Sequence, residues 1–212
     1  FDQLIFGIIK NRRASGARSE PDLLDLLMGA EDEETGERMS DVQLRDELVT
    51  MVSAGHETTA NALSWTLYLL AEHPEVDAKL KDELQSVLKG RAPSLEDLAQ
   101  LPYLEAVIKE SMRLYPPVWM VARSVAEDDV IGGVQVEKGA MIYACQWITH
   151  RDARFFPDPL AFKPERFLDG SVEAKHRYAY FPFAGGPRVY IGNAFSMMEA
   201  QLILGMIRSR YA

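Results

Sequence analysis

An acid and an alcohol stand side by side in the segment Ala54–Thr59, which reads Ala-Gly-His-Glu-Thr-Thr. Glycine and the two threonines lower the helix propensity of this stretch. A threonine hydroxyl that bonds the carbonyl one turn back would open the helix and leave room for a ligand or a water molecule. The pair Glu57 and Thr58 would then relay protons at the opening. The alternative is ordinary helix packing with an acid on the surface.

A carboxylate and a guanidinium are spaced three residues apart at Glu110 and Arg113. This spacing puts both groups on one face of a helix, where they form an ion pair. A second arginine, Arg166 in the segment Pro164–Phe167, would complete a buried cluster with Glu110. The alternative is a commonplace surface pair, which contributes little to stability.

A glycine-rich loop, Phe181–Phe195, brings together a basic and an aromatic side chain, Arg188 and Tyr190. Its glycines and its proline force a compact turn, and Gly192 allows a close approach where a helix begins at Asn193. Such a loop holds a side chain against a flat cofactor, while helix-terminal N–H groups soften the negative charge of a ligand. The alternative is a purely structural turn.

Helices carry most of these groups. Ser40 and Gln43 form the pattern of a capping box, and the apolar spacing that follows predicts one helix of about 30 residues that ends at His73. Residues from Val118 to Ile148 form β-branched and aromatic runs separated by glycine turns, which is typical of short strands. We expect a single domain over residues 1–212 that is mainly α (α+β), with further helices over residues 21–28, 75–89, 94–100, 102–115 and 193–207.

Composition excludes several classes of protein. The chain has 212 residues, and 23 lysines and arginines against 32 acidic residues give a net charge of −9, which argues against nucleic acid or an anionic membrane as a partner. No apolar stretch approaches the roughly 20 residues that a membrane span requires, and the first residues do not have the pattern of a signal peptide. The single cysteine, Cys145, fits a reducing compartment, so a cytoplasmic location is expected.

Taken in order, these segments resemble the C-terminal half of the cytochrome P450 family of haem-thiolate monooxygenases. The family's oxygen-activation motif, A/G-G-x-E/D-T-T, is matched at Ala54–Thr59, and its E-x-x-R motif is matched at Glu110 and Arg113. The haem-binding signature F-x-x-G-x-R-x-C-x-G is matched at residues 183–192 except at one position. The resemblance implies a truncated P450-like fold with a long central helix, small β elements and a haem-binding loop.

The resemblance also implies roles for individual residues around haem b, which would lie between the helix motif and the loop. Glu57 and Thr58 would handle protons on the distal side. Arg123 and Arg188 would hold the haem propionates. The remaining positions that match the cofactor-binding motifs are Ala54, Gly55, Phe183, Gly186 and Gly192.

The departure from the family pattern falls on the iron ligand, because Tyr190 occupies the position of the cysteine. If haem binds here as in the family, the axial donor to the metal becomes a phenolate, the ligand type of catalase. Ionisation of a phenol at neutral pH requires nearby positive charge, which iron and Arg188 would supply. The competing interpretation is a loss of the ligand that leaves weak haem binding or none.

Cys145 is expected to be a small buried hydrophobe, and His150 is expected to be structural.

The resulting hypothesis is a haem-dependent oxidoreductase that uses peroxide, as peroxidases, peroxygenases and catalases do, rather than a reductase-fed monooxygenase, because a phenolate favours ferric iron. Its partners would be peroxide or a small hydrophobic organic substrate. The alternative is a non-catalytic haem-binding module or an inactive fragment of a monooxygenase. Because the other half of the family's fold is absent, apolar residues of the long helix (Trp65, Leu67 and Leu69) would be exposed and favour a homo-oligomer.

Overall fold

The computed structural model describes residues 1–170, 172 and 176–211. Contacts divide the chain into two compact units, Phe1–Glu57 and Thr58–Ala212. The long helix α3 (Asp41–Glu72) contributes its first turns to the first unit and its remaining turns to the second. The expectation of a single domain remains a prediction.

The first unit contains α1 (Asp2–Ser15), α2 (Leu23–Gly29) and the start of α3. Its small core consists of four buried aliphatic side chains, Ile5, Ile9, Leu24 and Leu44. The helix α1 was not predicted from the sequence.

An ion cluster fastens α1 to the start of α2. The Arg12 guanidinium donates two hydrogen bonds of 2.8 Å to the Asp22 carboxylate and lies 2.6 Å from the Asp25 carboxylate. These contacts lower the pKa of both aspartates. Asp22 also caps α2, because its side chain accepts the N–H of Asp25.

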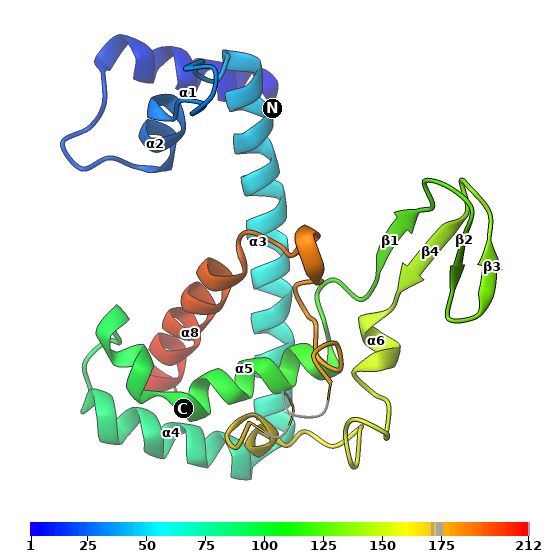
Figure 1. The fold of residues 1–212 in the computed structure, drawn as a ribbon. Coiled ribbons are helices and arrows are strands. Elements are labelled where there is room, and N and C mark those ends of the chain that lie inside the picture. Colours follow the sequence, from blue (N-terminus) through cyan, green and yellow to red (C-terminus); the bar gives the residue numbers. More distant parts are fainter. Residues whose placement is uncertain (171, 173–175, 212) are drawn as a thin grey trace. The chain divides into compact units, whose positions relative to one another are not determined.

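The second unit is built around α4 (Pro74–Leu88), α5 (Pro102–Leu114) and α8 (Asn193–Arg210), which pack against one another with the 3₁₀ helix η1 (Leu95–Gln100) (Figure 1). Proline at the first position of α4 and of α5 fits the start of a helix, where no N–H partner is needed. The buried side chains that these helices share include Leu80, Leu84, Leu104, Ile108 and Leu204.

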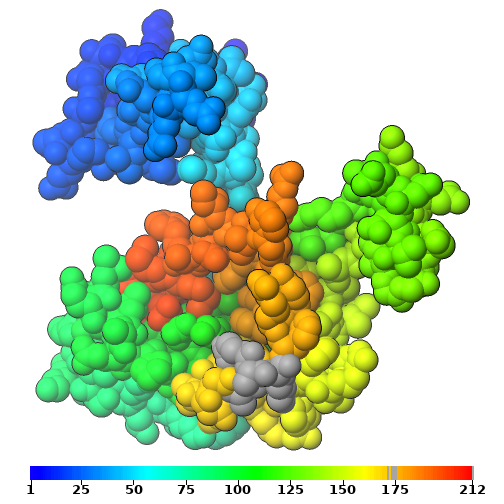
Figure 2. Space-filling model, in the orientation of Figure 1, coloured from blue at the N-terminus to red at the C-terminus, as the bar shows by residue number. Residues whose placement is uncertain are grey.

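The β structure consists of two small antiparallel sheets. Strand β1 (Val121–Ser124) pairs with β4 (Met141–Ala144), and β2 (Asp129–Ile131) pairs with β3 (Val134–Val136). The two glycines between β2 and β3 both have positive φ, as a tight hairpin turn requires. The β strands extend from the helical part of the second unit (Figures 1 and 2), and the short helix α6 (Gln146–Thr149) follows β4.

The long helix, the short strands and the last helix confirm the mainly α (α+β) class. Helix α3 has 32 residues and is α-helical at every position of the Ala54–Thr59 motif. Its capping box is formed by hydrogen bonds between Ser40 and Gln43 in both directions. No helix among the described residues is long and apolar enough to cross a membrane.

Two expectations about burial were wrong. Leu69, one of the three apolar residues expected to be exposed on α3, is buried in the main core. Trp65 is exposed as expected, but its ring stacks on Tyr115 with centroids 4.1 Å apart. Cys145 is half-buried rather than buried, and its thiol lies 3.5 Å from the Trp119 carbonyl oxygen.

Candidate haem site

A buried ion cluster underlies the candidate site. Glu110 and Arg113 are completely buried on α5, and their side chains form two hydrogen bonds, of 2.7 and 2.9 Å. The Arg166 guanidinium, on the 3₁₀ helix η2 (Pro164–Phe167), lies 3.3 Å from the same carboxylate. The predicted cluster of one acid and two arginines is therefore confirmed, and the interpretation as a surface pair is wrong.

Arg113 also holds a long connecting segment in place. Its guanidinium donates to the backbone carbonyls of His150, Pro159 and Ala161 at 2.8, 2.7 and 3.1 Å. A guanidinium has five N–H donors, so the remaining donors are satisfied by backbone after the carboxylate is bound. The chain between α6 and η2 is thus anchored to α5.

The glycine-rich loop is closed by its own backbone. The Tyr190 N–H donates to the Phe183 carbonyl at 3.0 Å, and the short 3₁₀ helix η3 (Gly186–Arg188) lies inside this closure. Gly186 has φ of +69°, a conformation that glycine adopts without strain. Gly192 is the N-cap residue of α8, so the helix begins at Asn193 as predicted.

Two residues beside Phe183 show how tightly the loop is folded. Ala184 is buried and has φ of +63°, in the left-handed region that disfavours a side chain. Gly185 lies against the Tyr178 ring, where a Cβ atom would come within 2.7 Å of a ring carbon. Sequence reasoning missed this contact of Tyr178.

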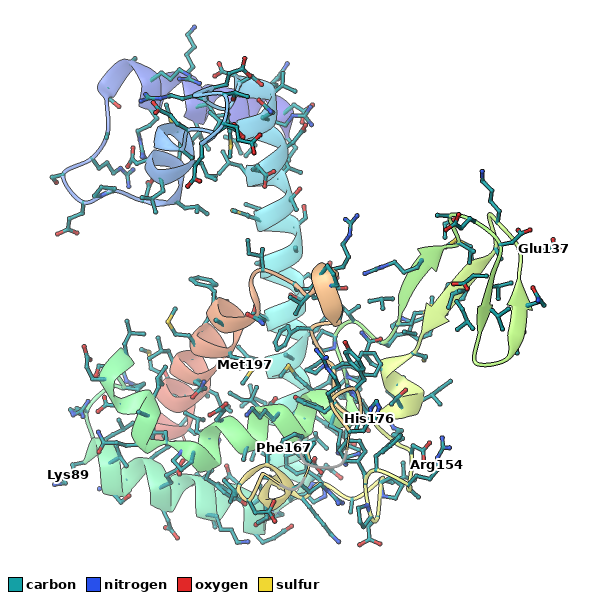
Figure 3. The ribbon with its side chains drawn as sticks, in the orientation of Figure 1. Lys89, Glu137, Arg154, Phe167, His176 and Met197 are labelled. Carbon is teal, nitrogen blue, oxygen red and sulfur yellow. The ribbon has the colours of Figure 1, made fainter. Side chains whose placement is uncertain are left out.

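The tip of the loop presents an apolar surface. Tyr190 is 38% exposed and Ile191 97% exposed, and Val189 and Phe195 are exposed beside them. Phe183 instead packs against the main core together with Met197 of α8 (Figure 3). The loop is therefore anchored through Phe183, while Tyr190 is exposed. In the space-filling view, the loop (orange) lies at the surface of the second unit (Figure 2).

The guanidinium groups of Arg123 and Arg188 have no acidic partner among the described residues. Arg188 lies in the loop, and Arg123 lies on β1 opposite Ile142. The Arg123 side chain donates a hydrogen bond of 2.7 Å to the adjacent Ala122 carbonyl. Both are exposed, so both are available to an anionic ligand.

The helix motif is divided between the two units. Ala54, Gly55 and Glu57 belong to the first unit, and their approach to the loop remains a prediction. Thr58 and Thr59 belong to the second unit. The Thr59 hydroxyl is buried and has no hydrogen-bond partner among the residues described.

A cavity of about 410 Å³ in the second unit lies apart from these groups. It is lined mainly by aromatic and apolar side chains, such as Tyr68 of α3, Tyr115 at the end of α5 and Trp147 of α6, and by no residue of the loop.

The sequence profile described as "Cytochrome P450" matches residues 1–212. The chain belongs to the cytochrome P450 family. Among related P450 proteins, cytochrome P450 4V2 of Mus musculus is 45% identical over 190 residues, which cover 89% of this chain and 36% of the relative. A protein of Streptomyces melanosporofaciens named cyclooctat-9-en-7-ol 5-monooxygenase is 41% identical over 209 residues, or 99% of this chain and 45% of the relative.

Solved P450 structures have the same fold. The heme domain of cytochrome P450DA superposes with a TM-score of 0.92 at 34% identity, covering all of this chain and 47% of that domain. The crystal structure of a P450 titled CYP102L1 gives 0.91 at 29% identity and covers 98% of this chain and 48% of that one. This chain thus spans between about a third and a half of the P450 proteins it matches. Haem b is the cofactor implied by this family and fold.

The residues of the loop fit a haem group. Haem brings four nitrogen ligands of its own, so the chain must supply an axial donor, an apolar surface and charges for two propionates. The loop offers the Tyr190 oxygen and exposed apolar side chains, and Arg123 and Arg188 have the charge that propionates require. The described residues contain no cluster of three histidine, cysteine or acidic side chains that would hold a bare metal ion instead.

Proposed function

We propose that this chain is the C-terminal, haem-binding part of a P450-type oxidoreductase in which the Tyr190 phenolate would bind the haem iron. The observation that carries the proposal is the position of Tyr190, which follows the signature residues of the loop and is fixed by the bond from its N–H to the Phe183 carbonyl. A phenolate is an established haem donor. Cys145 lies at the start of α6, outside the loop.

When bound, haem supplies the iron centre at which peroxide or oxygen is activated. A phenolate oxygen is a harder donor than a thiolate and favours ferric iron, so a peroxide-driven reaction is preferred to a reductase-fed one. Arg188, two residues before Tyr190, stabilises the anion and binds a propionate. Arg123 binds the other propionate.

Glu57 and Thr58 would hold and move protons for the reaction, with the Glu57 carboxylate as the acid and the Thr58 hydroxyl as the relay. The substrate is a small hydrophobic organic molecule or peroxide itself. The name of the Streptomyces relative, which specifies oxidation of a cyclic alcohol, supports an apolar organic substrate.

Addition of hemin to the full chain tests the ligand. We expect stoichiometric uptake and a high-spin ferric spectrum with a phenolate charge-transfer band. Tyr190→Phe removes the oxygen and should abolish that band, while Tyr190→Cys should give the red-shifted band of a thiolate-ligated haem after reduction and carbon monoxide addition. Absence of stoichiometric uptake by the parent chain, or an unchanged band in Tyr190→Phe, contradicts the proposal.

A non-catalytic haem-binding module is the second candidate function, and the exposure of the loop around Tyr190 favours it. A haem on an open surface is accessible to solvent and exchanges with other haem proteins. Peroxide turnover separates the two candidates. Oxidation of an added phenol at a rate well above that of free hemin supports the enzyme, and a rate equal to that of free hemin supports the module.

A further inference from the structure

His150 is a buried polar residue between the ion cluster and the loop. It follows the last residue of α6, its side chain is fully buried, and its ring contacts Tyr180 and Phe181 with centroids 5.1 and 5.3 Å away. Tyr180 is held in turn by Phe167 of η2 (Figure 3), whose ring centroid is 4.8 Å away, and by a hydrogen bond from its hydroxyl to the Lys109 carbonyl. The imidazole therefore has a fixed orientation.

The imidazole accepts a hydrogen bond from the chain that leads into the loop. The Phe181 N–H donates to the His150 Nε2 atom at 3.0 Å. Burial, together with the positive charges of Arg113 and Arg151, lowers the pKa of His150 to about 3. The ring is consequently neutral at neutral pH, with Nε2 as an acceptor and the ring hydrogen on Nδ1.

Backbone hydrogen bonds continue from Phe181 to the ligand position. The Phe181 carbonyl accepts the Ala184 N–H at 3.1 Å, and the Phe183 carbonyl accepts the Tyr190 N–H at 3.0 Å. A turn from Phe181 to Ala184 therefore leads directly into the loop that the bond between Phe183 and Tyr190 closes. A displacement of Phe181 would move the turn and, through Phe183, the closed loop.

The same histidine is tied to the ion cluster through its own backbone. Its carbonyl accepts a 2.8 Å hydrogen bond from Arg113, whose guanidinium is locked onto Glu110. His150 thus joins the most deeply buried charges of the second unit to the entry of the loop.

We propose that His150 is a positioning residue for the axial ligand: its Nε2 atom fixes Phe181 and thereby sets the backbone from which the Tyr190 side chain extends. The inference rests on the proposed function for the role of Tyr190, whereas the hydrogen bond to Phe181 is independent of it. The full chain without haem therefore tests the positioning, and hemin binding by the parent chain tests the ligand.

Three variants separate the acceptor from the ring. His150→Phe keeps an aromatic ring but leaves the Phe181 N–H without a partner. His150→Gln places an amide oxygen at nearly the reach of Nε2 and should restore the bond. His73→Phe is the matched control, because the His73 ring also contacts a phenylalanine, Phe162, and also forms a hydrogen bond with the backbone outside the loop, there from its Nδ1 atom to the Leu69 carbonyl.

Amide hydrogen exchange of the haem-free full chain is the primary measurement. In His150→Phe we expect exchange at Phe181, Ala184 and Tyr190 to be about tenfold faster than in the parent, with α5 unchanged. His150→Gln and His73→Phe should stay within about threefold of the parent at these amides. With hemin, the phenolate band should shift or broaden in His150→Phe and return in His150→Gln.

The proposal is overturned if the three amides exchange at the same rate in His150→Phe as in the parent. An effect of the same size in His150→Gln also overturns it, since that result would assign the role to the ring and not to the acceptor. If His150→Phe does not fold, His150→Asn replaces it, because its amide is one methylene shorter than that of glutamine. Faster exchange in His150→Asn than in His150→Gln then supports the proposal, and equal exchange refutes it.

Discussion

Ala184 carries a methyl group in a backbone conformation that suits glycine. Its φ of +63° brings the Cβ atom close to the following carbonyl, which costs about 1–2 kcal/mol in an L-residue. The strain falls between Phe183, which anchors the loop, and Gly185, which lies against Tyr178. The loop is therefore held in its conformation by neighbours and not by the preference of this residue.

Ala184→Gly should stabilise the second unit by about 0.5–1 kcal/mol, because relief of strain exceeds the lost burial of one methyl group. Urea unfolding monitored by tryptophan fluorescence measures the change. The control is Ala179→Gly, at a buried alanine without positive φ, which should lower stability. Equal destabilisation by both substitutions would contradict the argument.

The neutral imidazole of His150 makes stability depend on pH. The pKa is about 3 in the folded chain and about 6.5 in the unfolded chain, so between these values the unfolded chain binds a proton that the folded chain does not. This contribution is fully present above pH 6.5 and is lost as the pH falls towards 3. Between pH 6.5 and pH 5 it amounts to about 2 kcal/mol.

Urea unfolding at pH 7.5 and pH 5.0 measures this dependence, in a range above that in which the aspartates titrate. His150→Gln removes the titrating group and keeps the acceptor, so the loss of stability at pH 5.0 should be smaller in this variant by about 2 kcal/mol. The same loss in parent and variant would show that another group is responsible.

Among the elements, α5 is joined to the connecting segment by a buried arginine. Arg113 binds Glu110 and three backbone carbonyls, and both charged side chains are completely buried. Removal of one partner from such a pair leaves an uncompensated charge. The connecting segment from His150 to Ala161 loses its anchor at the same time.

Arg113→Met should lower the free energy of unfolding by about 3–5 kcal/mol, as measured by urea unfolding. Arg154→Met is the control, because Arg154 also pairs with an acid, Asp152, but its side chain is 82% exposed (Figure 3). The control should change stability by less than about 1 kcal/mol. Similar effects of the two substitutions would contradict a dominant role for burial.

The elements that could be predicted are those marked by residues close to one another in the sequence. Helix α3 was predicted from its capping box and its apolar period, and α8 from the glycine that precedes it. Helix α1 was missed because its N-cap, Phe1, makes no side-chain capping bond, and α6 because it has only four residues.

The site was predictable in part for the same reason. The three-residue spacing of Glu110 and Arg113 is visible in the sequence, and the loop is recognisable from its glycines. The bond between His150 and Phe181 joins residues 31 positions apart, and the acceptors of Arg113 are backbone carbonyls, which every residue has. Such contacts depend on the packing of distant segments and leave no local signal.

For the whole molecule, the division into two units implies two levels of local stability. The core of the first unit contains four buried aliphatic side chains and depends also on the contacts of Arg12 with two aspartates. The core of the second unit is several times larger. Small units bury a smaller fraction of their surface and are less stable.

Native-state hydrogen exchange should therefore show α1 and α2 opening at a lower free energy than α5 and α8. Arg12→Met removes the ion cluster and should accelerate exchange in α1 and α2 while exchange in α5 and α8 stays unchanged. A parallel acceleration in all four helices would show that the chain unfolds as one cooperative unit.

The closure of the loop between Tyr190 and Phe183 uses only peptide groups. Every residue except proline has the N–H that this bond requires, so the closure is indifferent to the side chain at position 190. Tyrosine and cysteine codons differ by a single nucleotide. One point mutation is thus enough to exchange the phenol oxygen, which we propose as the iron donor, for a thiol sulfur on an otherwise constant loop.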